Sequence, residues 1–199
     1  TLIFSMMGVL NFAHASVFML GAYLSYQFGR WVGFWPALVI APVLCGPVGA
    51  GIERYGLRHV HGRGHVAEIL FTFGLAYLIE ELVTMIWGRN AVANNVPPAV
   101  DFSLFTLFGS SFPAYKGLMM VISVSMLVFL WLALKRTRIG LVIQAALSHP
   151  RMVGALGHDV PGVFVLVFAI GSALAGLAGV IGGFMLLTQP TLAQAIGPI

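Results

Sequence analysis

The chain has very few charged residues. Of its 199 residues, only 8% are Asp, Glu, Lys or Arg, whereas 59% are hydrophobic; soluble proteins average about 25% charged residues. This deficit excludes an ordinary water-soluble domain and indicates a chain that lies in a lipid bilayer. The ten basic residues are separated by long apolar runs and form no continuous basic face, so nucleic acid is not an expected partner.

Cysteine and several catalytic motifs are also missing. Cys45 is the single cysteine, which excludes a disulfide framework. No Gly-Lys dipeptide and no H-E-x-x-H motif occur, which excludes a phosphate-binding P-loop and a zinc protease of that type. His59, His61 and His65 occur on a basic, glycine-containing stretch without cysteine, which favours a solvated loop over a metal site. We therefore expect no enzyme, no metal and no other cofactor.

Five long apolar segments are present, and a bilayer core requires about 20 apolar residues per helix. They run from Asn11 to Phe28, Trp31 to Gly51, Val66 to Trp87, Gly117 to Leu134, and Pro161 to Leu187. These segments predict an all-α, polytopic transmembrane helical bundle that forms a single membrane-spanning domain over residues 1–199. Both ends of the sequence fall in apolar stretches, so we expect a chain truncated at both termini.

Most of the basic residues fall in two of the polar connections. Seven of the ten lie in segments 52–65 and 135–160. Because cytoplasmic loops carry the excess of Lys and Arg, both segments are expected in the cytoplasm. The connections between them alternate with the predicted spans, so the topology is self-consistent.

The opening segment has polar interruptions. Leu2 to Phe28 is too long for one straight span and contains Gly8, Asn11 and His14. This pattern predicts a broken or re-entrant helix, and such backbone is tolerated only inside protein or beside a wet cavity. Asn11 and His14 are therefore candidates for a substrate pathway. For His14 a purely structural hydrogen bond to a freed carbonyl is the alternative.

The third span contains two consecutive carboxylates, Glu80 and Glu81. An intramembrane carboxylate is costly and is a candidate functional group for that reason. Consecutive helical residues point about 100° apart, so only one of them can face a given cavity. Glu80 is the pathway candidate; the alternative is that both lie near the outer interface and reach water.

The outer connection, residues 88–116, predicts a small β-hairpin. Residues 100–108 and 111–115 flank a Gly109-Ser110 turn. Its aromatic side chains are typical of a membrane interface; docking of a soluble partner is the alternative.

The polar stretch from Lys135 to Pro161 predicts a short helix of its own. Ser148 can cap it, Pro150 suits its first turn and Gly157 can end it, which gives a helix from His149 to Leu156. The residues expected to form an apolar knob on this helix are Met152, Val153, Ala155 and Leu156. Such a knob suits a groove on another protein.

Three ordered groups of residues carry a family resemblance. They are Thr137-Arg138-Ile139-Gly140 followed by Gln144-Ala145-Ala146, Pro150 and Ala155-Leu156-Gly157; Gly8 to Ala15 with Leu20-Gly21-Ala22-Tyr23; and Phe168 to Gly179. In this order they resemble the permease subunits of branched-chain amino acid ABC importers, over nearly the whole chain. Gln144 stands where the family has Arg, and His149 where it has an acidic or amide residue.

The resemblance implies a multi-pass subunit of the bacterial inner membrane. Such a subunit pairs with a second homologous permease subunit, receives branched-chain amino acids or related small amides from a periplasmic substrate-binding protein, and docks two cytoplasmic ATPase subunits that hydrolyse the ATP. The residues that the resemblance assigns to ATPase coupling are Arg138, Gly140, Gln144, Ala145, Pro150, Ala155, Leu156 and Gly157.

Two other classes of function remain open from the residues alone. One is an ATP-independent channel or secondary carrier for a small neutral solute, and the other is a structural membrane subunit of a larger complex. The channel or carrier would need no cytoplasmic docking helix and no partner ATPase.

Overall fold

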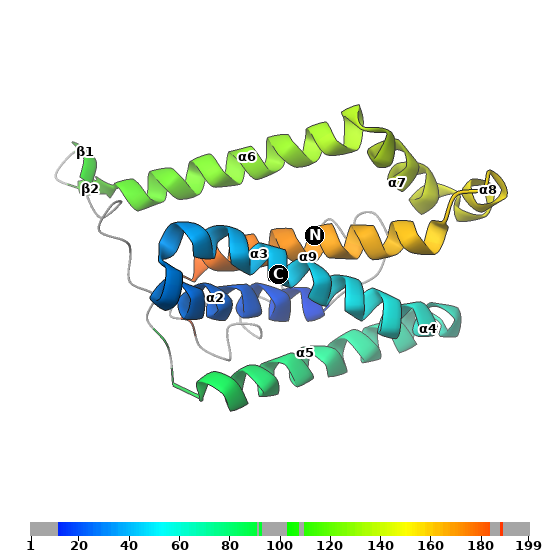
Figure 1. The fold of residues 1–199 in the computed structure, drawn as a ribbon, viewed down its shortest axis with the longest axis horizontal. Coiled ribbons are helices and arrows are strands. Elements are labelled where there is room, and N and C mark those ends of the chain that lie inside the picture. The colour runs from blue at the N-terminus through cyan, green and yellow to red at the C-terminus, as the bar shows by residue number, and fades with distance from the viewer. Residues whose placement is uncertain (1–11, 91, 93–102, 108–109, 184–187, 189–199) are drawn as a thin grey trace.

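Long helices lie side by side along one direction, and a small β-hairpin lies at one end of them (Figure 1). The structure is a computed structural model, and it describes residues 12–90, 92, 103–107, 110–183 and 188. The helical bundle confirms the predicted all-α class.

Helices and strands follow one another with short connections. In chain order they are α2 (Ala13–Val32), α3 (Phe34–Gly51), the π-helical turn η1 (Ile52–Leu57), α4 (Arg58–Val60), the 3-10 turn η2 (His61–Arg63), α5 (His65–Trp87), β1 (Ser103–Leu107), β2 (Ser110–Pro113), α6 (Ala114–Arg136), α7 (Arg138–Ser148), α8 (Pro150–Ala155) and α9 (Val160–Gly182).

Helices α2, α3, α5, α6 and α9 correspond to the five predicted spans. Four helical runs in the described part of the chain are long and apolar enough to cross a membrane: α3 with its continuation, α5, α6 and α9. Helix α2 is 20 residues long but carries polar residues such as Ser16, Ser25 and Gln27, which lower its hydropathy.

Glycines with positive φ separate several of the helices. Gly33, Gly64 and Gly88 have φ angles of 92°, 96° and 84°, a region that side chains with a Cβ avoid. Gly33 alone connects α2 to α3, so these two helices form a tight antiparallel pair.

Helix α3 continues further than the sequence suggested. It passes through Pro42 and Pro47 and runs on through η1 and α4, so that residues 34–60 form one helical run of 27 residues. The segment 52–65, interpreted as a loop, is therefore mostly helical. The π-helical turn accommodates one extra residue without ending the helix.

The core of the bundle is formed by α2, α3 and α9, which pack through small residues. A Cβ on Gly176 would overlap the side chain of Cys45 in α3, and a Cβ on Gly21 would overlap the backbone of Gly176. Small residues recur every four positions along one face of α9, and all four of them are buried, namely Gly171, Ala175, Gly179 and Gly183. The helices that pack against this face are α2 and α3 of the same chain. The spacing of small residues along α9 could not identify them.

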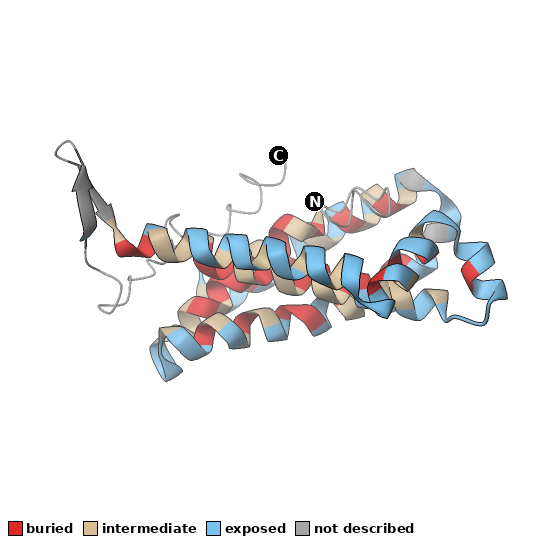
Figure 2. Ribbon diagram, turned by 90° about the horizontal axis from the view of Figure 1, so that it is seen from above, coloured by how far each residue is buried: buried red, intermediate tan, exposed pale blue. Residues whose placement is uncertain are grey.

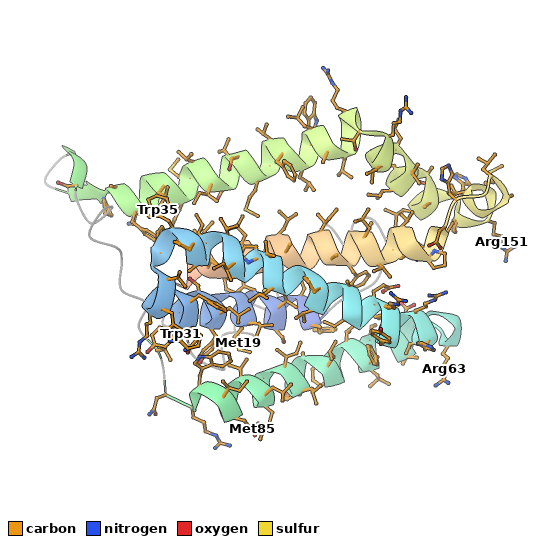
Figure 3. The ribbon with its side chains drawn as sticks, viewed as in Figure 1. Met19, Trp31, Trp35, Arg63, Met85 and Arg151 are labelled. Atoms are coloured by element: carbon orange, nitrogen blue, oxygen red, sulfur yellow. The ribbon has the colours of Figure 1, made fainter. Side chains whose placement is uncertain are left out.

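Helices α2 and α5 run in the same direction. Phe12 contacts Phe73, with ring centroids 6.0 Å apart, and near the other end Gln27 accepts a hydrogen bond of 3.1 Å from the indole of Trp87. Arg63 and Arg151 lie together at one end of the molecule, whereas Trp31 and Trp35 lie at the other (Figure 3). The two basic segments thus share one end of the bundle.

The predicted hairpin is present. Strands β1 and β2 pair antiparallel, with Leu107 opposite Ser110 and Ser103 opposite Pro113, and an irregularity between Ser103 and Phe105. The strands are shorter than the predicted ranges, and residues 100–102 lie outside the described part.

Helix α6 is largely uncovered by the rest of the described chain (Figure 2). Its contacts are mainly with α7 and β2, and the hydroxyl of Tyr115 in its first turn donates a hydrogen bond to the carbonyl of Ile181. It is therefore anchored at its two ends.

Candidate functional site

The connection between α6 and α7 is a sharp, hydrogen-bonded elbow. Thr137 caps α7, because its hydroxyl oxygen accepts a bond of 2.9 Å from the backbone N–H of Gly140. The same hydroxyl donates to the carbonyl of Ala133 in α6. The amide nitrogen of Gln144 donates to the carbonyl of Leu134 at 2.7 Å. The start of α7 is thus fastened to the end of α6.

At Gly140 the backbone of α7 approaches the backbone of α6 closely. A Cβ there would lie 2.5 Å from the carbonyl oxygen of Leu134 and 2.6 Å from its Cα. These are backbone atoms that cannot rotate away. Two of the residues that the family resemblance selected, Gly140 and Gln144, therefore hold α7 against α6.

Helix α7 is amphipathic. Ile143 and Ala146 are buried on the side that faces α9 and α6, whereas Ile139 and Leu141 are exposed. Arg138 and Ala145 are also exposed. One face of α7 packs on the bundle, and the opposite face is available for contact.

Helix α8 begins differently from the prediction. Ser148 is the last residue of α7, and His149 is the N-cap of α8 without a side-chain capping bond. Pro150 occupies the first turn, as predicted. The backbone of His149 instead donates to the carbonyl of Ala145 at 2.8 Å, so that the chain turns from α7 into α8 without a gap.

The end of α8 is as predicted. Gly157 has a φ of 85°, and its N–H donates to the carbonyl of Gly154 at 3.0 Å, while the N–H of His158 donates to that of Val153 at 3.2 Å. This pair of bonds is the Schellman arrangement, in which a left-handed glycine closes a helix. The structure thus ends α8 within one residue of the predicted Leu156.

The apolar knob on α8 is smaller than predicted. Met152 is 67% exposed and Leu156 is 79% exposed, but Val153 is only 5% exposed. Val153 therefore anchors the helix, and Met152, Ala155 and Leu156 remain for an external contact. The helix lies at the tip of the molecule, where Arg151 projects outward (Figure 3).

The candidate pathway residues occupy α2 and α5. Asn11 lies outside the described residues. His14 is half-buried in α2, and its Nδ1 has no hydrogen-bond partner within the described part of the chain. From Ala13 onward α2 is continuous through Ser16, so the predicted break is absent from residues 13–16. The rest of the predicted broken segment, residues 2–11, lies outside the described residues.

Glu80 is half-buried and Glu81 is exposed, so the two carboxylates do face differently. The hydroxyl of Ser16 in α2 donates a hydrogen bond of 3.4 Å to the carbonyl of Ala76 in α5. Ser16 and Ala76 therefore lie at the same height along the two parallel helices. Glu80 follows Ala76 by four residues and His14 precedes Ser16 by two. At 1.5 Å per residue, the two side chains are therefore separated by about 9 Å along the helix axes. The structure places them on neighbouring helices at different depths.

Sequence reasoning missed several buried polar residues. Tyr23 and Ser25 of α2 are buried, and neither hydroxyl has a partner among the described residues. Glu53 and Glu68 are 2% and 6% exposed. Because Tyr23 and Ser25 are polar residues in an apolar span, the sequence could have marked them as candidates for buried polar groups. Glu53 could not be found in this way, because its segment was interpreted as a loop.

No group of three or more His, Cys, Asp or Glu side chains that could hold a metal ion occurs among the described residues.

Comparisons with known proteins agree with this architecture. The family described as branched-chain amino acid transport system / permease component matches residues 1–196. The high-affinity branched-chain amino acid transport system permease protein LivH of Escherichia coli K12 is 24% identical over 198 residues, which cover 92% of this chain and 63% of LivH.

Two further relatives support the same family. The permease protein BraD of Pseudomonas aeruginosa is 23% identical over 195 residues, 92% of this chain and 64% of BraD. A protein of Methanocaldococcus jannaschii named "Probable branched-chain amino acid transport permease protein LivH" is 28% identical over 210 residues, 98% of this chain and 64% of that protein.

No solved structure matches the chain significantly. The chain spans less than two thirds of the length of these curated relatives. Because the family match covers almost every residue, the chain belongs to the family of branched-chain amino acid transport system permease components.

Proposed function

We propose that this chain forms the membrane-spanning part of a permease subunit in an ATP-binding cassette importer, and that α8 is where the motor subunits push. The observation that carries this proposal is the exposed apolar tip of α8, with Met152 and Leu156 projecting from a short helix that begins at Pro150 and is closed by Gly157. Met152 and Leu156 are four residues apart and so lie on the same side of the chain at this tip, and adjoining exposed apolar side chains are a candidate contact surface for another protein.

The elbow gives a mechanical path from α8 into the membrane. Helix α7 is bonded to α6 through Thr137 and Gln144, and it also packs against α9. A displacement of α8 by a partner therefore moves the ends of two transmembrane helices together. Rigid-body movement of this kind is a standard route to alternating access.

The end that carries α8 faces the cytoplasm in this proposal. Segments 52–65 and 135–160 hold seven of the ten basic residues, and both lie at the same end of the bundle. The positive-inside rule then places that end inside the cell. The location is the bacterial inner membrane.

The partners follow from the family. We propose a second homologous permease subunit, two cytoplasmic ATPase subunits that hydrolyse the ATP, and a periplasmic substrate-binding protein. The proposed substrate is a branched-chain amino acid or a related small amide, and the names of LivH and BraD support the first of these.

Asn11, His14 and Glu80 are the proposed pathway residues. His14 and Glu80 are half-buried on neighbouring helices, so they can line one route at successive depths. Substitution of His14 by Ala is expected to lower transport while the ATPase subunits remain bound. Loss of assembly instead would assign His14 a structural role.

Site-directed crosslinking tests the docking proposal. Leu156→Cys in a Cys45→Ala background is expected to crosslink to an ATPase subunit in the assembled transporter, because Leu156 is exposed at the tip of α8. Trp31→Cys is the matched control, since Trp31 is equally exposed at the opposite end. Equal crosslinking of both positions, or crosslinking of neither, would refute the proposal, and uptake that persists without ATP would favour a carrier.

A further inference from the structure

The helical run that begins with α3 is longer than a bilayer core is thick. Residues 34–60 are 27 residues long, which is about 40 Å at 1.5 Å per residue. The hydrocarbon core is about 30 Å thick. Because α3 itself fills that thickness, η1 and α4 extend into the layer of lipid headgroups.

Two arginines lie on this extension. Arg54 and Arg58 are four residues apart and both are exposed. Tyr55 is 77% exposed, and the guanidinium of Arg54 lies 5.8 Å from the centroid of its ring. Tyrosine is enriched at this depth because its ring suits the apolar side and its hydroxyl suits the wet side.

The carboxylates of the same region point inward. Glu53 is buried beside Arg54 in sequence, and Glu68 at the start of α5 is buried as well. Burial thus separates the charges, because the acidic side chains lie inside the bundle and the basic ones lie on its surface. The outer surface of η1 and α4 is therefore positively charged.

An apolar strip on α3 leads to these arginines. Val39, Val43 and Pro47 recur every four residues on the same face of the helix, and all three are exposed. Such a strip suits an extended acyl chain. It ends one to two turns before Arg54.

We propose that Arg54 and Arg58 bind the phosphate of an anionic phospholipid whose acyl chains lie along Val39, Val43 and Pro47. Guanidinium groups bind phosphate oxygens through paired, charge-assisted hydrogen bonds. Basic residues next to a membrane helix attract anionic lipids. The positive charge of the surface selects such a lipid over a zwitterionic one, and the depth of the two arginines brings them level with its phosphate.

The experiment compares lipid binding by three variants of the full chain. The Arg54→Gln/Arg58→Gln variant removes both charges, whereas Arg54→Lys/Arg58→Lys keeps them. Arg63→Gln/Arg151→Gln is the matched control, because it removes the same charge from two exposed arginines that do not adjoin the strip. Native mass spectrometry in detergent measures the binding of phosphatidylglycerol and of phosphatidylcholine with the same acyl chains.

Each surface arginine strengthens attraction to an anionic lipid about fivefold. The glutamine variant is therefore expected to bind phosphatidylglycerol about 30-fold more weakly than the unmodified chain, with little change for phosphatidylcholine. The lysine variant keeps the charges but loses the paired hydrogen bonds, so its affinity for phosphatidylglycerol is expected to lie between those of the glutamine variant and the unmodified chain. Binding by this variant would also show that changes at these positions permit folding.

Three results would overturn the proposal. The first is equal loss of phosphatidylglycerol in the glutamine variant and in the control. The second is equal affinity of the unmodified chain for the two lipids. The third is unchanged lipid binding together with loss of the ATPase subunits, which would assign the two arginines to a protein contact.

Discussion

Replacing Gly140 with alanine tests whether the α6–α7 elbow transmits force. The new Cβ would lie 2.5 Å from the carbonyl oxygen of Leu134 and 2.6 Å from its Cα, whereas ordinary contact begins at about 3.4 Å. Since these are backbone atoms, α7 has to move away from α6 by about 1 Å. A one-carbon change at this position is thus expected to open the elbow.

The cost can be worked from the bonds that this movement breaks. Overpacking costs about 1–3 kcal/mol. Two bonds join α7 to α6, from the Thr137 hydroxyl to the carbonyl of Ala133 and from the amide of Gln144 to the carbonyl of Leu134. Both would exceed hydrogen-bond distance, at about 0.5–1.5 kcal/mol each. Alanine recovers about 1 kcal/mol of helix propensity. The net cost to the elbow is about 1–5 kcal/mol.

The rate of limited proteolysis at the elbow measures this free-energy cost. Arg136 and Arg138 flank the elbow and are exposed, so trypsin cuts there when the elbow opens. A cost of at least about 1 kcal/mol raises the open population, and with it the cleavage rate, at least about fivefold. Transport is expected to fall while ATPase binding persists, because α8 is unaltered.

The matched control is Gly74→Ala in α5. A Cβ at Gly74 would meet no atom within 4 Å, so its cleavage rate and transport should match those of the unmodified chain. Unchanged cleavage and transport in Gly140→Ala, at a normal level in the membrane, would refute the reasoning that the elbow is rigid and coupled.

Three further substitutions have defined outcomes. Gly179→Ala should lower the free energy of unfolding in detergent by about 1–3 kcal/mol, because its Cβ would lie 2.9 Å from the carbonyl carbon of Phe18; an unchanged melting curve would contradict the close packing of α2 and α9. Trp87→Phe should cost about 0.5–1.5 kcal/mol through loss of the 3.1 Å bond to Gln27, and the same loss in a Gln27→Ala background would show that the bond contributes nothing. Glu80→Gln should reduce substrate uptake at normal expression, and full uptake would remove Glu80 from the pathway.

Hydropathy and helix punctuation predicted much of this architecture. Apolar runs of membrane length identified the spans, because the bilayer imposes a minimum length on each helix. Pro150 and Gly157 located α8, because both residues act on the local backbone. Local chemistry of this kind can be read from a single sequence.

Contacts between distant segments could not be predicted in the same way. The small residues of α9 indicated a close neighbour, but only the fold shows that Gly179 faces α2. The inward position of Glu53 depends on a π-helical turn, for which no residue pattern gave a signal. Val153 faced inward because α8 folds back on the bundle, which periodicity within a six-residue helix cannot indicate.

The single residue that joins α2 to α3 has a consequence for how the chain enters the membrane. Helix α2 is absent from the four described runs that are apolar enough to span on their own, whereas α3 follows it immediately after Gly33. If α2 inserted alone during synthesis, its polar groups would face lipid, which costs free energy. Packing against α3 removes this cost. We therefore expect the two helices to enter the bilayer together as one hairpin, in which the apolar α3 offsets the cost of inserting α2.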